Sequence, residues 1–109
     1  MGLYTFITEY QGGTTVDQVL SKDLKGAQEK WVRSLQRVAW LDKNEKDYIS
    51  SDGYDDPVQI DGVHNVWYFN LIPIDDLMCI NIILTKGEKI PFPVVEELPI
   101  FTIKIDEDD

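Results

Sequence analysis

One stretch of this chain has helical periodicity over several turns, and β-prone segments lie on both sides of it. The apolar residues of segment 22–39 recur at intervals that place them on one helix face: Leu24, Ala27, Trp31, Leu35 and Val38. No other part of the chain has such a pattern over a comparable length. A single amphipathic helix must bury its apolar face against strands, so the pattern predicts an α+β fold.

The ends of the predicted helix can also be assigned from residue types. Ser21 is a residue type that caps helix N-termini, and Asp23 suits the positive end of the helix dipole. Gly26 lies inside the predicted helix and is expected to cost about 1 kcal/mol relative to alanine. We therefore predict a helix over residues 22–39, weakened at one position.

Two β-prone runs before the helix predict a hairpin. Residues 3–10 alternate between two faces, and residues 14–20 are again rich in β-branched side chains. Gly12 and Gly13 lie between the runs, and glycine reaches the positive φ angles that a tight reversal requires. A phosphate-binding loop would need a lysine, a hydroxyl residue and a helix directly after the glycines. A strand is predicted there instead, so we interpret the glycines as a turn.

The remaining strand signals follow a long acidic segment. Residues 62–72 and 77–84 form a second predicted hairpin whose two faces are both largely apolar, which favours a central place in the sheet. Residues 100–105, "IFTIKI", predict an edge strand. The order is thus β-β-α-β-β-β, with four or five antiparallel strands packed on one long helix. We expect one domain over residues 1–105 and a disordered acidic tail over 106–109.

Charge limits the classes of partner. The 109 residues include 20 Asp and Glu against 10 Lys and Arg, a formal net charge of −10. Such a surface repels nucleic acids and anionic membranes and attracts a basic protein. The first residues lack a basic leader pattern, and no apolar run approaches the roughly 20 residues that span a bilayer. These features predict a cytoplasmic protein with a basic protein partner and without nucleic-acid or membrane binding.

Candidate catalytic residues are few. Cys79 lies in the apolar run "LMCINIIL", which favours a buried thiol over a nucleophile. His64 is the only imidazole, and metal sites converge three or four ligands. The acidic segments do not match the spacing of a calcium-binding EF-hand loop. The sequence therefore predicts a non-enzymatic protein without a metal or cofactor.

The acidic segment 42–62 is the main candidate for function, because long connections in small domains are often functional. Aromatic residues interleave with its carboxylates, and aromatic anchors among charges are typical of protein interfaces. The predicted partner-binding residues are Asp52, Tyr54, Asp55, Asp56 and Asp61. The alternative is a small-ligand-binding or enzymatic domain with a pocket near His64 and Tyr68. The predicted edge strand also leaves a homodimer open.

Several of these segments together resemble a known group of proteins. The stretches "YQGGTTVDQV", "LKGAQEKW", "DGVHNVWYFN" and "INIILT" resemble a loose group of short bacterial proteins. Some small acidic proteins of this kind lie near toxin genes and look like immunity proteins. The resemblance spans residues 3–85 and implies no catalytic residue. It implies a protein that acts by binding another protein.

Overall fold

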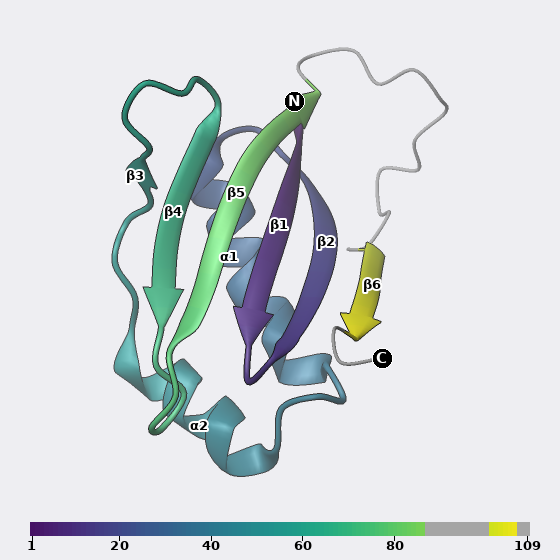
Figure 1. Ribbon diagram of the computed structural model, residues 1–109, viewed down its shortest axis with the longest axis vertical. Helices are drawn as coiled ribbons and strands as arrows, with labels where there is room; N and C mark the ends of the chain where they lie inside the picture. The colour runs from purple at the N-terminus through teal and green to yellow at the C-terminus, as the bar shows by residue number, and fades with distance from the viewer. Residues whose placement is uncertain (87–100, 107–109) are drawn as a thin grey trace.

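The protein is an α+β domain in which an antiparallel sheet packs on helices (Figure 1). The computed structural model describes residues 1–86 and 101–106. Its strands, in the sheet order β3-β4-β5-β1-β2-β6, are β3 (Val58–Gln59), β4 (Val66–Leu71), β5 (Met78–Lys86), β1 (Gly2–Tyr10), β2 (Gly13–Ser21) and β6 (Phe101–Asp106). The predicted fold class is confirmed at this level, with the two-residue strand β3 as an unpredicted member of the sheet.

The first hairpin forms as predicted. β1 and β2 pair from Gly2 with Ser21 to Tyr10 with Gly13, which leaves Gln11 and Gly12 as a two-residue turn. Both turn residues have positive φ, 51° at Gln11 and 79° at Gly12. Two positive φ angles match the right-handed twist of paired strands, so the first glycine of the pair turns the chain.

The helix after the hairpin is shorter than predicted. Helix α1 spans Leu24–Ser34, and a single 3₁₀ turn, η1 (Leu35–Arg37), follows it. The predicted N-cap Ser21 is wrong, because Ser21 is the last residue of β2 and pairs with Gly2. Asp23 caps the helix instead, and its Oδ1 accepts a hydrogen bond from the Gly26 nitrogen at 2.7 Å.

Gly26 is required by this cap rather than being a weak point. A Cβ at this position would lie 2.6 Å from the Ser21 Oγ and 3.0 Å from the Asp23 Oδ1. Ser21 is buried, so its hydroxyl has little room to move. We expect Gly26→Ala to lower the free energy of unfolding by about 1 kcal/mol, although alanine at an open helix position raises it by about that amount.

Urea denaturation of Gly26→Ala, with and without Ser21→Ala, measures this effect. Removing the Ser21 hydroxyl makes room for the new methyl group, so the double variant should recover part of the loss. A stabilised Gly26→Ala variant would show that the cap tolerates a side chain there.

A second helix follows η1 within the acidic segment 42–62 and was not predicted from the sequence. Helix α2 spans Lys43–Asp52 and begins with a capping box. The Glu45 nitrogen donates to the Asp42 Oδ1 at 2.8 Å, and the Asp42 nitrogen donates to the Glu45 Oε1 at 2.9 Å. The order of elements is therefore β-β-α-α-β-β-β-β, and the predicted order with one helix is only partly correct.

The core lies between α1 and one face of the sheet. Trp31 of α1 is fully buried, stacks on Phe6 with ring centroids 5.2 Å apart, and meets the Phe69 ring edge-on at 5.9 Å. Its Nε1 donates to the buried Asp17 Oδ2 at 2.7 Å. The remaining buried apolar residues include Tyr4, Tyr10, Val19, Ala27, Val32, Leu35, Leu41, Ile49, Leu71, Met78, Ile80 and Ile82.

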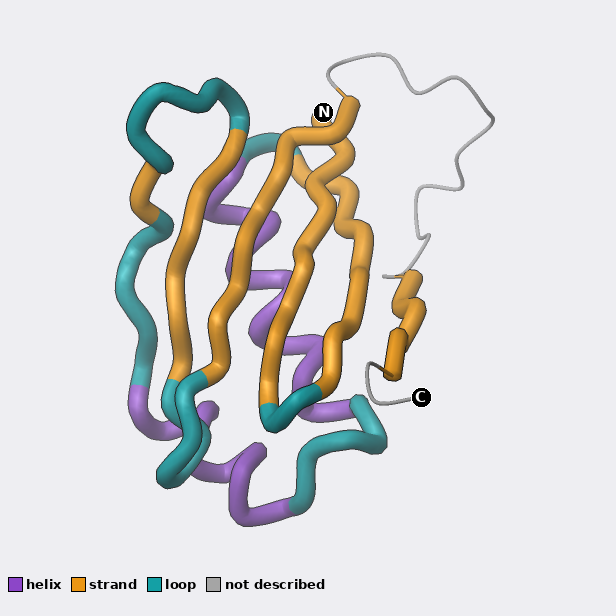
Figure 2. The backbone as a smooth tube through the Cα atoms, in the orientation of Figure 1, coloured by secondary structure: helices purple, strands orange, loops and turns teal. Residues whose placement is uncertain are grey.

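The opposite face of the sheet has no helix over it in the described part of the chain, and Figures 1 and 2 look onto it with the helices behind the strands. Alternation along β1, β2, β4 and β5 defines its side chains. We call this the open face, and it consists of Leu3, Thr5, Ile7, Glu9, Thr14, Val16, Gln18, Leu20, Val66, Tyr68, Asn70, Cys79, Asn81, Ile83 and Thr85.

The C-terminal strand lies at the sheet edge as predicted. β6 pairs with β2 alone, in antiparallel register from Gly13 with Asp106 to Gln18 with Phe101. Asp106, the first residue of the predicted tail, is the last residue of this strand. The rest of that tail and the proline-containing segment 87–100 lie outside the described residues.

Candidate interaction surface

The predicted partner-binding segment runs along the β4 side of the sheet, from the end of α2 to β3 (Figure 1). α2 ends at Gly53, whose φ of 78° releases the chain from the helix. The segment then continues extended to Val58, which pairs with Tyr68. Four of the five predicted residues thus follow the last residue of α2, Asp52, along this edge.

Tyr54 attaches the segment to the core. Its half-buried ring lies 6.3 Å from the Phe69 ring, and the Lys25 Nζ lies 5.3 Å from the Tyr54 ring centroid. The same Nζ donates to the Asp56 Oδ1 at 2.7 Å. This hydrogen bond raises the pKa of Lys25, and the negative charge of Asp56 adds to the effect. Tyr54 therefore has a structural role, which the sequence did not indicate.

A buried glutamine holds the next residue. The Gln28 Nε2 donates to the Asp55 backbone oxygen at 2.8 Å, and Gln28 is fully buried in α1. The backbone of Asp55 is thereby fixed while its side chain stays exposed. Asp55 and Asp56 consequently present carboxylates to solvent from a position that α1 defines.

The predicted acidic residues form a row and not one cluster. Asp61 is exposed in the turn beyond β3, whereas Asp52 ends α2 at the other end of the segment. Asp55 and Asp56 lie between them and are the pair closest to α1. The structure therefore brings together Tyr54, Asp55 and Asp56, and it places Asp61 apart from them.

The two residues of the alternative pocket have separate surroundings. His64 is exposed in the loop before β4 and lines a shallow pocket of about 230 Å³ with residues 59–63. Tyr68 lies on the open face, where its hydroxyl donates to the Cys79 Sγ at 3.7 Å and accepts from the Asn70 Nδ2 at 3.2 Å. Both contacts turn the hydroxyl along β4 away from His64, so the two side chains do not share a site.

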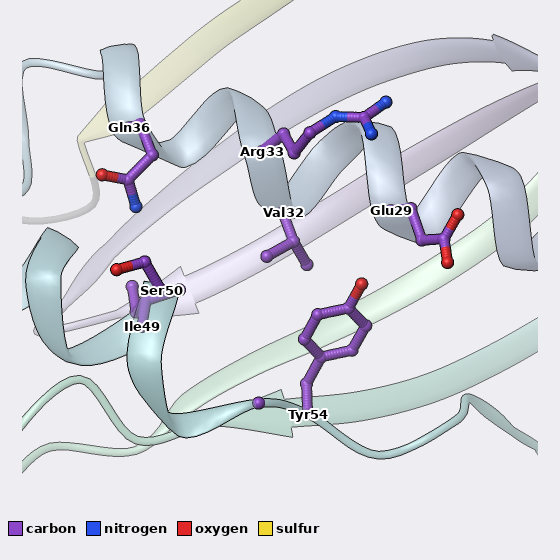
Figure 3. Close-up of a pocket in the computed structure, with 8 residues that line it drawn as sticks. Glu29, Val32, Arg33, Gln36, Ile49, Ser50 and Tyr54 are labelled. Carbon is purple, nitrogen blue, oxygen red and sulfur yellow. The ribbon is translucent and has the colours of Figure 1, made fainter.

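A groove that sequence patterns did not indicate lies beside Tyr54 (Figure 3). Its volume is about 430 Å³, and α1, η1, α2 and the two residues after α2 line it. Val32, Ile49 and the Tyr54 ring supply apolar surface, while polar side chains from both helices surround them. The full lining is Glu29, Val32, Arg33, Gln36, Ile49, Ser50, Gly53 and Tyr54. Its lining residues come from segments that are separate in the sequence.

A second group of carboxylates lies near Tyr10, the last residue of β1. The buried Tyr10 hydroxyl donates to the Glu45 carboxylate and to the Pro73 backbone oxygen. Burial raises the pKa of Tyr10, and the Glu45 hydrogen bond and the charges of Glu45, Asp76 and Asp42 raise it further. The hydroxyl thus stays protonated and ties the end of β1 to α2 and to the turn after β4.

The described residues show neither a metal centre nor a membrane span. No three His, Cys, Asp or Glu residues within 1–86 and 101–106 are grouped so that they could hold a metal ion. No helix in that part of the chain is long and apolar enough to cross a membrane. Comparison with known proteins returned no match to a family model, a curated protein or a solved structure.

Proposed function

We propose that this chain is a non-enzymatic cytoplasmic protein that binds a basic protein partner, as an immunity-type inhibitor binds a basic toxin such as a nuclease. One observation supports this function above others. The groove beside Tyr54 has apolar surface, and the exposed carboxylates of Asp55 and Asp56 follow directly after it. Interfaces commonly combine an apolar anchor site with charges around it.

The groove and the carboxylates have complementary tasks. The groove accommodates an apolar partner side chain, or the aliphatic stem of a lysine or arginine, against Val32, Ile49 and Tyr54. Asp55 and Asp56 attract the cationic groups nearby, and Glu29 adds a carboxylate at the groove itself. Apolar contact supplies affinity, whereas the charges raise the association rate and select a basic partner.

The negative charge of the surface remains largely uncompensated. Among the described side chains the ion pairs are Lys25 with Asp56 at 2.7 Å and Lys43 with Asp47 at 2.9 Å. Both pairs are exposed to solvent and contribute little to folding. The formal charge of −10 therefore gives the protein a negative electrostatic potential, which attracts cationic proteins to its surface.

Neutralising the two central carboxylates tests the proposal. We expect the double variant Asp55→Asn, Asp56→Asn to bind a synthetic peptide of lysine, arginine and leucine about tenfold more weakly than the parent at low salt. Fluorescence anisotropy of the labelled peptide measures the affinity. The difference should shrink as salt screens the exposed charges.

The control removes the same charge elsewhere. Glu9→Gln with Asp47→Asn neutralises two exposed carboxylates away from the groove, and His64→Ala alters the shallow pocket. Both are expected to bind the peptide within about twofold of the parent. Equal weakening in the charge control would indicate non-specific attraction. A parent chain that does not bind the peptide at low salt, or does not slow cleavage by a basic nuclease, would contradict the proposal.

A further inference from the structure

We infer that a second copy of this chain covers the open face, so that two sheets pack face to face in a homodimer. This interface is independent of the proposed partner-binding groove, which lies on the helix side of the molecule (Figures 1 and 3). It also differs from pairing at the edge strand, because it uses side chains of four strands.

The composition of the open face is unlike that of a solvated surface. Its aliphatic residues are half-buried and neighbour one another through the strand register: Leu3 beside Leu20, Ile7 beside Val16, and Val66 beside Ile83. Charged residues form 28% of the whole chain, yet Glu9 alone is charged among the open-face residues named above. An antiparallel sheet that faces water has a polar outer face, so these aliphatic pairs indicate a covered one.

Several side chains of the open face are already bonded to one another. The Gln18 Nε2 donates to the Thr5 Oγ1 at 3.2 Å, and the Thr5 and Thr85 hydroxyls form a hydrogen bond. Tyr68 bridges Asn70 and Cys79 in the same way. Removing water from a polar group is costly unless it has a partner. These pairs keep their partners when the face is covered.

Charge favours a second copy over a basic partner on this face. Lysines or arginines placed on it would lose water without finding a carboxylate, apart from Glu9 at the end of β1. Two acidic chains, in contrast, repel each other wherever their carboxylates meet. The open face itself carries almost no charge, so two copies can approach through it with little repulsion. A two-fold axis makes such a contact self-complementary.

The area is sufficient for a dimer of moderate affinity. Four strands about 4.8 Å apart and roughly 23 Å long present roughly 450 Å² of projected surface per copy. The accessible area lost by the pair is on the order of 1,000 Å², the lower range for a specific interface. Aligned packing of two sheets, about 10 Å apart, satisfies this geometry. We therefore expect a reversible dimer with a dissociation constant in the micromolar range.

Sedimentation of the full chain over a range of concentrations tests the inference. The parent should show a monomer–dimer equilibrium, and Ile7→Glu, which introduces a carboxylate beside Val16 and Asn81, should raise the dissociation constant at least about a hundredfold. The control Tyr48→Glu introduces a carboxylate at a 43% exposed position on α2, outside the open face, and should leave the dimer intact. Circular dichroism confirms that both variants are folded.

Cys79 provides a second measurement that needs no substitution. It is the only cysteine of the chain and lies half-buried on the open face. Its alkylation rate should fall at least about fivefold as the protein concentration rises through the dimer transition. A chain that stays monomeric at all concentrations would overturn the inference, whether Cys79 reacts freely or is covered within its own chain. A dimer that persists in Ile7→Glu would also overturn it and would place the contact elsewhere, such as at β6.

Discussion

Replacing Trp31 with alanine is expected to lower the free energy of unfolding by about 4 kcal/mol. Trp31 is completely buried, with a relative exposure of 0%. Its ring contacts Phe6 and Phe69. Truncation would leave a cavity where α1, β1 and β4 meet. Because small domains are stable by only about 5–15 kcal/mol, the variant would lose a large part of its stability.

Urea denaturation followed by far-ultraviolet circular dichroism measures the loss. Tyr48→Ala is the matched control, because Tyr48 is an aromatic residue of α2 with 43% exposure. Its removal should change the free energy of unfolding by less than about 0.5 kcal/mol. A loss below about 1 kcal/mol for Trp31→Ala would show that the stacked ring is not central to the core.

The indole nitrogen of Trp31 makes a separable contribution. Trp31→Phe keeps an aromatic ring but removes the donor to the buried Asp17 Oδ2. An acceptor that loses its donor in the interior costs about 1–3 kcal/mol. In a double-mutant cycle with Asp17→Asn, the two changes should be non-additive by about 1 kcal/mol, because Trp31→Phe removes the hydrogen bond and Asp17→Asn removes the charge of its acceptor.

Local sequence patterns predicted the helices and strands whose formation depends on residues near one another in the chain. The β1–β2 hairpin follows from strand alternation and Gly12, and α1 follows from apolar spacing that centres on Trp31. The N-cap was wrong because strand pairing extends to Ser21, which a local rule does not detect. The start of α2 was detectable, since Asp42 and Glu45 stand at capping-box spacing.

The site depends on contacts between distant segments, and these are not visible in the local sequence. Asp55 and Asp56 were identified from the sequence, but the groove beside them is lined by Val32 of α1 and Ile49 of α2, which lie far apart in the sequence. Gln28 reads as an ordinary helix residue, yet it fixes the Asp55 backbone from the interior. Likewise, the apolar character of β4 and β5 on both faces was visible, but only the structure shows that one face has no helix over it in the described part of the chain.

The buried tyrosines predict a loss of stability in alkaline solution. Burial raises the pKa of Tyr10 and of Tyr4 above the ordinary value of 10.0, and nearby carboxylates add to both effects. Since the unfolded chain releases these protons near pH 10 and the folded chain retains them, the stabilisation is complete below that pH and decreases above it. Each tyrosine contributes a slope of about 1.4 kcal/mol per pH unit between its two pKa values.

Urea denaturation at a series of pH values above 10, in the parent, Tyr10→Phe and Tyr4→Phe, isolates this effect. In each single variant, the free energy of unfolding should fall with pH less steeply than in the parent, by about 1.4 kcal/mol per pH unit. The double variant should lack both contributions. Comparison with the parent cancels the titration of other groups, such as Lys25, whose pKa the Asp56 hydrogen bond raises. Parallel curves for parent and variants would contradict the prediction. A smaller slope in Tyr10→Phe alone would assign the alkaline sensitivity to the junction between β1, α2 and the turn after β4, where Glu45 and Pro73 accept the hydroxyl.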